Sequence, residues 1–189
     1  MKRIAVVAAG LLMSVASFAQ TWSVDKGHSR LGFGITHMGI SLFEGNFKSY
    51  DATITSSKED FSDAVFEVSA DVASINTDNE RRDGHVKSAD MLDAEKFPKL
   101  TFKSTSISKV ADKKYKVVGD LTFHGVTKPV TLEVVYNATI TNPQSKKQIA
   151  GFRITGSFKR SDFGIAPGFN TSMLSDDVQL LANGEFAKN

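Results

Sequence analysis

The residues with the clearest capacity for chemistry lie in a polar stretch, residues 75–102, of a chain that otherwise alternates like β-strand. Arg82 and His85 are three positions apart, so on a helix they would share a face. Such a pair could bind a phosphate or carboxylate, because arginine donates paired hydrogen bonds to these anions. Arg82, His85 and His37 are therefore candidates for binding an anionic head group. The alternative is that Arg82 pairs locally with Asp83 and holds the helix on the body of the protein.

Catalytic and metal-binding patterns are missing from the sequence. The four histidines, His28, His37, His85 and His124, lie in separate segments without the spacing of a metal-binding helix. There is no cysteine, no Gly-x-Ser-x-Gly nucleophile motif and no visible pair of carboxylates for acid–base work. We therefore expect no catalytic residues, no metal site and no cofactor, and predict that the protein is not an enzyme.

The N-terminus predicts export. Lys2 and Arg3 precede an apolar run over residues 4–15, and the small residues of Ser17-Phe18-Ala19 follow. This is the pattern of a cleavable signal peptide, and the run is shorter than the ~20 apolar residues of a spanning helix. We predict a signal peptide over residues 1–19, a periplasmic location and no membrane span. No cysteine follows that could carry a lipid anchor.

The charge of the exported chain is balanced. Without Lys2 and Arg3, 21 basic and 21 acidic residues remain. A nucleic-acid partner would require a basic face, so we expect none. No linker or internal repeat divides residues 20–189, which we interpret as one domain.

Most of the chain alternates with a period of two, which predicts sheets with one apolar and one wet face. Short turn signals between these segments favour about eight antiparallel strands joined as a meander. One segment, residues 79–96, reads as a helical polar cap, with Thr77 or Asp78 as its N-cap and Pro98 as its end. The clearest alternating segments are residues 28–38, 64–72, 115–123, 130–138, 152–158 and 178–186.

Phenylalanine is unusually frequent, with 14 residues against 3 tyrosines and 1 tryptophan. A sandwich core would explain this, and so would a barrel lined with rings. Glycines recur inside the strands, which favours a strongly coiled barrel. An eight-stranded barrel is wide enough either to be filled by side chains or to hold one small ligand, and the alternation leaves both open. The candidate lumen residues are Phe33, Ile35, Phe47, Phe66, Val68, Phe102, Leu121, Phe123, Leu132, Val134, Phe152, Ile154 and Phe158.

A series of ordered motifs resembles the YceI-like family of exported, lipocalin-like proteins. The resemblance covers residues 20–187 and implies an all-β, antiparallel eight-stranded lipocalin-like barrel with one short helical cap. Met91 stands where the family often has phenylalanine. The matching motifs are Trp22-Ser-Val-Asp25-x-x-His28-Ser29, Leu31-x-Phe33-x-Ile35-x-His37, Gly45-x-Phe47, Arg82-Asp83-x-His85-Val86, Phe97-Pro98-x-Leu100-Thr101-Phe102, Gly119-x-Leu121-Thr122-Phe123-His124-Gly125 and Asp162-Phe163-Gly164-Ile165.

The resemblance also implies a ligand, a small-molecule lipid of the polyisoprenoid type or a similar long-chain amphiphile. The function expected from it is that of a periplasmic carrier. Two alternatives stay open: a stress-linked structural partner of a membrane protein complex, which would need an exposed apolar patch, and a lipid-modifying enzyme. An unpaired edge strand could also pair two copies into a homodimer.

Overall fold

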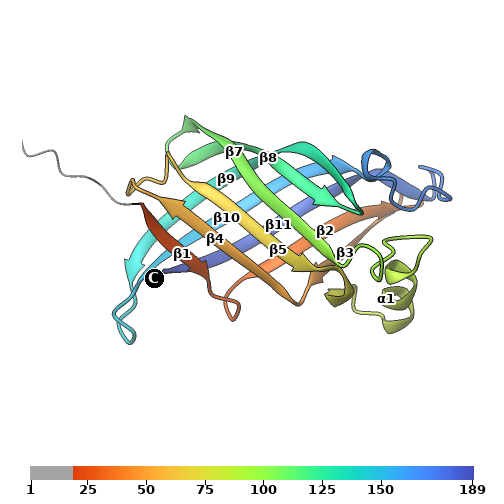
Figure 1. Ribbon diagram of the computed structural model, residues 1–189, viewed down its shortest axis with the longest axis horizontal. Helices are drawn as coiled ribbons and strands as arrows, with labels where there is room; N and C mark the ends of the chain where they lie inside the picture. The colour runs from red at the N-terminus through yellow and green to blue at the C-terminus, as the bar shows by residue number, and fades with distance from the viewer. Residues whose placement is uncertain (1–18) are drawn as a thin grey trace, which may run out of the picture.

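The computed structural model describes residues 19–189, so the predicted signal peptide, apart from Ala19, lies outside the described residues. The described chain forms one antiparallel sheet of eleven strand segments (Figure 1). In chain order they are β1 (Gln20–Val24), β2 (Arg30–His37), β3 (Ser41–Phe47), β4 (Tyr50–Ser56), β5 (Val65–Asp71), β6 (Ile75–Asn76), β7 (Lys99–Ala111), β8 (Lys114–Phe123), β9 (Val126–Thr141), β10 (Gln148–Lys159) and β11 (Leu174–Lys188).

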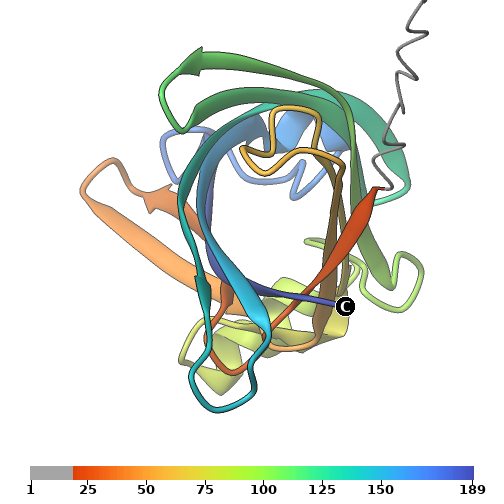
Figure 2. The ribbon, with the colours of Figure 1, turned by 90° about the vertical axis from the view of Figure 1, so that its left-hand side faces the viewer.

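The sheet closes on itself as a barrel of eight strands. Three pairs of short segments each act as one bent strand, namely β1 with β2, β3 with β4, and β5 with β6. The long last strand, β11, closes the ring by pairing with β2 along its first part and with β1 near its end. Every other neighbour in the ring is also next along the chain, as expected for a meander (Figure 2). The predicted eight-stranded antiparallel barrel is therefore confirmed.

Two strand glycines make room for aromatic rings. A Cβ atom at Gly119 would lie 2.4 Å from Cζ of Phe102, and one at Gly45 would lie 2.4 Å from Cζ of Phe33. In each pair a ring from the neighbouring strand lies over the bare backbone of the glycine. The strand glycines thus mark close approaches, which is one of the roles that glycine has in sheets.

The helical cap is shorter than predicted. Helix α1 covers Glu80–Lys87, not residues 79–96, and its N-cap is Asn79, whose side chain accepts a 2.9 Å hydrogen bond from the Arg82 backbone N–H. Thr77, one of the two predicted caps, instead bonds the Asp83 carboxylate. At the other end the Ser88 hydroxyl bonds the His85 carbonyl, and turns replace the helix because serine competes for backbone groups there. No helix within residues 19–189 is long and apolar enough to cross a membrane.

A loop closes the end of the barrel opposite α1. Residues 57–64 connect β4 with β5 and fold inward over the ring of strands (Figure 2). The Phe61 side chain on this loop is 2% exposed, and its ring meets those of Trp22 at 5.3 Å and Phe152 at 5.0 Å. The Tyr115 hydroxyl donates to the Asp60 carbonyl. We call residues 57–64 the plug.

The carboxylate of Asp63 organises the plug. It accepts hydrogen bonds from the hydroxyls of Ser56 and Ser57 and from the backbone N–H groups of Ser57 and Lys58. Partial burial raises the pKa of Asp63, but the hydrogen bonds outweigh burial and lower the pKa from 3.8 to about 2. The ionised carboxylate is therefore part of the folded plug.

Asp63→Asn should lower the free energy of unfolding at pH 7 by roughly 1–2 kcal/mol, because it removes a charged acceptor shared by four donors. Since the folded pKa lies below the unfolded one, Asp63 stabilises the fold above about pH 4, and this contribution is lost as the pH falls towards 2. Urea unfolding across this range should show a weaker pH dependence in the variant. Glu59→Gln, at an exposed carboxylate of the same loop, is the control. Equal losses in both variants would contradict the role of Asp63.

Candidate ligand-binding site

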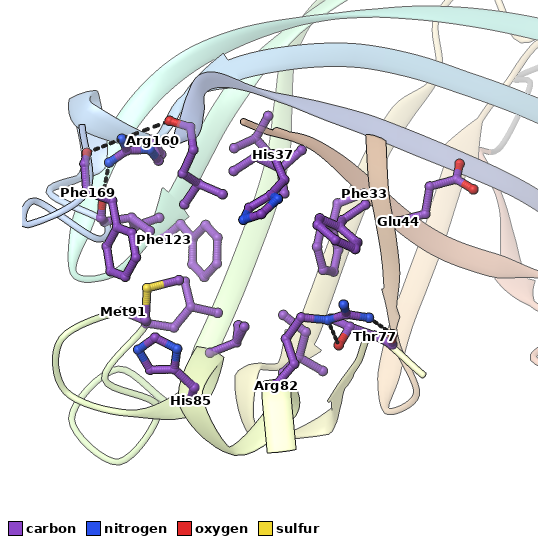
Figure 3. Close-up of a pocket in the computed structure, with 18 of the residues that line it drawn as sticks. Phe33, His37, Glu44, Thr77, Arg82, His85, Met91, Phe123, Arg160 and Phe169 are labelled. Atoms are coloured by element: carbon purple, nitrogen blue, oxygen red, sulfur yellow. Dashed lines mark hydrogen bonds between the residues drawn. The ribbon is translucent and has the colours of Figure 1, made fainter. Parts of the chain in front are cut away.

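A cavity of about 370 Å³ occupies the end of the barrel opposite the plug. Its walls come from β2 and β3, from the ends of β8, β10 and β11, from α1 and from the loop of residues 164–173 (Figure 3). Pockets for small molecules span ~300–1,000 Å³ and are mostly apolar, so both size and lining suit a ligand. The apolar part of the lining includes Phe33, Ile35, Phe43, Phe47, Val86, Met91, Leu100, Phe123, Phe158, Ile165, Phe169 and Val178.

The predicted lumen residues divide between the two halves of the barrel. Phe33, Ile35, Phe47, Phe123 and Phe158 line the cavity. The other eight do not, and they pack in or against the core instead: Phe66, Val68, Phe102, Leu121, Leu132, Val134, Phe152 and Ile154.

The division arises because alternation tells which side chains of a strand point into the barrel, but not how far along the barrel axis each of them lies. Phe66 and Phe152 point inward, but their rings pack edge-to-face near the plug. The two alternatives left open by the sequence therefore both occur, because one half of the barrel is filled and the other is hollow.

Arg82 lies on the wall of the cavity and is held in a fixed position. Its Nε donates to the Thr77 hydroxyl at 2.8 Å, and its Nη2 donates to the Thr77 carbonyl. Its guanidinium carbon lies 4.6 Å from the centre of the Phe43 ring, within the range of a cation–π contact. The structure records no hydrogen bond from Nη1 to any described residue. This edge of the guanidinium can therefore bind a ligand while the other edge stays fixed.

Thr77, which holds Arg82, is itself held in place by hydrogen bonds to Asp83. The buried Asp83 carboxylate accepts from the Thr77 backbone N–H at 2.7 Å and from its hydroxyl at 2.6 Å. Burial raises the pKa of Asp83, but the hydrogen bonds from Thr77 lower it by more, so the group is ionised. No direct salt bridge joins Arg82 to Asp83 among the described residues. The direct pairing of Arg82 with Asp83 that the sequence suggested is therefore replaced by hydrogen bonds between each of these residues and Thr77.

The two other head-group candidates also line the cavity. His85 is exposed on α1, bonds the Asp90 carboxylate through Nε2 at 3.1 Å and faces the Phe169 ring at 6.0 Å. His37 lies at the end of β2 with its ring 5.1 Å from that of Phe43. In Figure 3 His37 projects towards the cavity from β2, and Arg82 and His85 project towards it from α1. The structure therefore brings all three candidates to one cavity.

Arg160 is a site residue that the sequence analysis missed. It lies at the start of the short 3₁₀ helix η2 (Arg160–Phe163), it is 4% exposed, and it reaches the cavity wall. All five of its N–H groups donate to backbone carbonyls of the loop of residues 164–173 and the start of β11, which fold around it (Figure 3). The acceptors are Ser175, at 3.1 Å, Ile165, at 3.1 Å, Ala166, at 2.8 Å, Phe169, at 2.6 Å, and Leu174, at 3.1 Å. Arg160 therefore shapes the wall but has no donor left for a ligand.

One group in the described part of the chain could hold a metal by proximity. Asp25, His28 and Glu185 have ligand atoms within 4.8 Å of one another. The Asp25 carboxylate bonds His28 Nδ1 at 2.9 Å and the Gly27 backbone N–H at 2.9 Å, so the same contacts stabilise the turn between β1 and β2. The hydrogen bond to Asp25 raises the pKa of the exposed His28. None of the three residues lines the cavity.

The arrangement suits binding of an amphiphile. The lining is largely hydrocarbon and aromatic, and α1 adds the polar side chains of Arg82 and His85. The Glu44 carboxylate also borders the cavity, but in Figure 3 it points away from the other labelled side chains. An apolar chain would be buried among the rings, and an anion would lie beside the guanidinium edge.

Comparisons with known proteins agree with this geometry. A family model described as a YceI-like domain matches residues 22–186. A UPF0312 protein of Staphylococcus aureus is 36% identical over 172 residues, which cover 88% of this chain and 96% of the relative. The crystal structure of the Campylobacter jejuni YCEI protein has a TM-score of 0.74 at 34% identity, covering 82% of this chain and 90% of that chain.

A more distant structure shares the fold. It is described as a polyisoprenoid binding domain from Saccharophagus degradans, implicated in plant cell wall breakdown. Its TM-score is 0.66 at 17% identity, and the match covers 89% of this chain and 98% of that chain. At this identity the likeness concerns the fold.

Proposed function

We propose, on the premise that this chain belongs to the YceI-like domain family, that it is a periplasmic carrier for a long-chain amphiphile. The observation that carries the proposal is the apolar cavity, which has a plug at one end of the barrel and polar side chains at the other. Burial of each methylene contributes roughly 0.8 kcal/mol. A chain of several methylenes therefore binds even after the cost of ordering it.

The polyisoprenoid class is proposed for the ligand. It follows from the resemblance in sequence, and a domain of the same fold is described as binding polyisoprenoids. The cavity adds a physical argument, since its lining combines flexible Met91 with branched and aromatic side chains that can pack around a methylated chain. The periplasmic location rests on the predicted signal peptide.

The head group is proposed to be anionic and to lie beside Arg82, His85 and His37. The unpaired Nη1 edge of Arg82 provides two N–H donors in the plane that suits a phosphate or carboxylate. His85 stands at the exposed side of the cavity, where a head group would meet water. The proposed lumen contacts are Phe33, Ile35, Phe47, Phe123 and Phe158, which are the predicted residues that line the cavity.

Native mass spectrometry of the protein from the periplasm of expressing cells tests the carrier proposal. We expect an adduct with the mass of a long-chain lipid, which extraction would release and identify. Delipidated protein should take up an added polyprenyl phosphate. A protein without an adduct that also takes up no polyprenyl lipid would refute the carrier function.

Arg82→Ala tests the head-group site. The variant should bind a polyprenyl phosphate about tenfold more weakly than the wild type and should bind the matching neutral polyprenol almost unchanged, because only the phosphate uses the charged donors. The same native mass spectra measure both ligands. Arg81→Ala, on the same helix but outside the cavity lining, is the matched control. Equal losses for the phosphate and the alcohol would mean that Arg82 acts only as a structural contact.

A further inference from the structure

Exposed apolar side chains gather at the open end of the barrel. Seven large hydrophobic side chains are exposed within residues 19–189, and four of them lie here. Met38, Ile40 and Leu42 belong to the hairpin of β2 and β3, and Met173 belongs to the loop of residues 164–173. The exposed fraction of Ile40 is 84%, the largest of the seven. We call these four residues the apolar tip.

The backbone joins the two parts of the apolar tip. The Met38 backbone N–H donates to the Met173 carbonyl at 2.9 Å, and His37 pairs with Leu174. Met38 has a φ of +52° and Gly39 has a φ of +68°. Asparagine and glycine adopt this left-handed conformation more readily than methionine does. A methionine at Met38 is therefore not explained by the needs of the turn, and its exposed side chain requires another reason.

The two segments that form the apolar tip carry no charge. Residues 38–43 and residues 163–175 contain no charged side chain, although 23% of the residues in the chain are charged. The polar groups between the apolar ones are the neutral side chains of Ser41, Asn170, Thr171 and Ser172. Aliphatic side chains beside neutral hydrogen-bonding groups suit insertion just below the lipid head groups, because a charged side chain would be costly in the hydrocarbon beneath them.

The apolar tip is continuous with the cavity. Met173 is both exposed and part of the cavity lining, and its neighbours Phe169 and Leu174 line the same cavity. From the other segment Phe43 reaches the cavity wall one residue after Leu42. An apolar surface thus extends from the interior of the barrel to the outside at one place. A chain leaving a bilayer there would pass from one apolar environment to another.

We propose that the apolar tip docks the protein on a phospholipid bilayer, with the cavity mouth facing the lipid. This rests on the proposed carrier function and names the surface from which the carrier loads. The exposed aliphatic side chains enter the interfacial layer, and burial of their area drives the association. Docking of this kind does not depend on net charge, so it is insensitive to salt.

Cosedimentation with vesicles of phosphatidylethanolamine and phosphatidylglycerol tests the proposal. The protein should sediment with the vesicles, and Ile40→Asp should weaken partitioning at least about tenfold, because it puts a charge in place of an aliphatic side chain that docking would bury in lipid. Ile40→Ser should have a smaller effect. The matched control is Ile140→Asp, at a 60% exposed isoleucine that does not belong to the apolar tip, and it should partition like the wild type.

Several results would overturn docking. The wild type could stay in solution, or Ile40→Asp and Ile140→Asp could lose vesicle binding equally. Salt could weaken vesicle binding strongly. The wild type could also form a dimer in solution that Ile40→Asp dissociates. The dimer would make a second copy the partner of the apolar tip.

Uptake of a short-chain polyprenyl phosphate without vesicles separates the docking proposal from the carrier proposal. Ile40→Asp should keep this uptake, whereas a wild type that docks but takes up no lipid would refute the carrier function and leave docking intact.

Discussion

Replacing Arg160 with methionine should lower the free energy of unfolding by roughly 3–5 kcal/mol. The substitution keeps an apolar chain of similar length but removes the arginine donors of five carbonyl groups, two of them in buried hydrogen bonds. Of the two buried carbonyls, that of Ala166 keeps the Phe169 N–H as a donor. Each buried acceptor without a partner costs about 1–3 kcal/mol, and relaxation of the loop lets water recover part of the total. Because small domains are stable by only about 5–15 kcal/mol, the loss should be plain in urea unfolding followed by circular dichroism.

Arg160→Lys is the matched variant. Lysine keeps the positive charge but has three donors on one nitrogen, so it cannot reach acceptors arranged around a planar guanidinium. Its stability should therefore lie between those of the wild type and Arg160→Met. A methionine variant within about 1 kcal/mol of the wild type would show that the carbonyls find other partners, and that Arg160 does not hold the loop.

Ile35→Trp should lower lipid uptake by at least about tenfold while the barrel stays folded. Ile35 is a half-buried residue of β2 that lines the cavity, so a larger ring has space to enter it. The ring would displace two or more methylenes of the ligand, and each methylene is worth roughly 0.8 kcal/mol. A titration with a polyprenyl phosphate, read by native mass spectrometry, measures the change.

Ile140→Trp makes the same substitution at an exposed position outside the cavity and should leave uptake unchanged. Ile35→Leu, which keeps the volume, should retain most of the binding. Thermal unfolding of Ile35→Trp close to that of the wild type would show that the ring occupies empty space. Full uptake by a folded Ile35→Trp would place the ligand outside this cavity.

The barrel could be predicted from the sequence because its signal is local. Alternation in β2, β8 and β10 assigns Phe33, Leu121 and Phe152 to the inner face, and the short turns between strands impose a meander. The division into a filled and a hollow half could not be predicted in this way. It depends on Phe61, which comes from a loop without periodicity and enters the barrel only through tertiary packing.

Arg160 carried a signal that could have been recognised. It continues the inward phase of Phe152, Ile154 and Phe158 along β10, and a charged residue in an inward position needs partners. The partners themselves could not be predicted, because they are carbonyls of a loop folded by long-range contacts. The length of the cap was also predicted wrongly. Polar composition suggested a helix over residues 79–96, but hydrogen bonds of serine and aspartate side chains end α1 at Lys87.

The plug limits the routes by which a ligand could enter and leave the barrel. A barrel open at both ends could act as a conduit, with one membrane or protein delivering cargo at the first end and another collecting it at the second. With Phe61 seated across one end, a hydrocarbon chain bound as proposed would leave by the route through which it entered, with its polar end outermost. The partner that delivers the lipid and the partner that collects it would then have to contact the same end of the barrel, one after the other. On the proposed carrier function, the protein would work as a shuttle, and its rate would be set by how quickly it leaves one surface for the next.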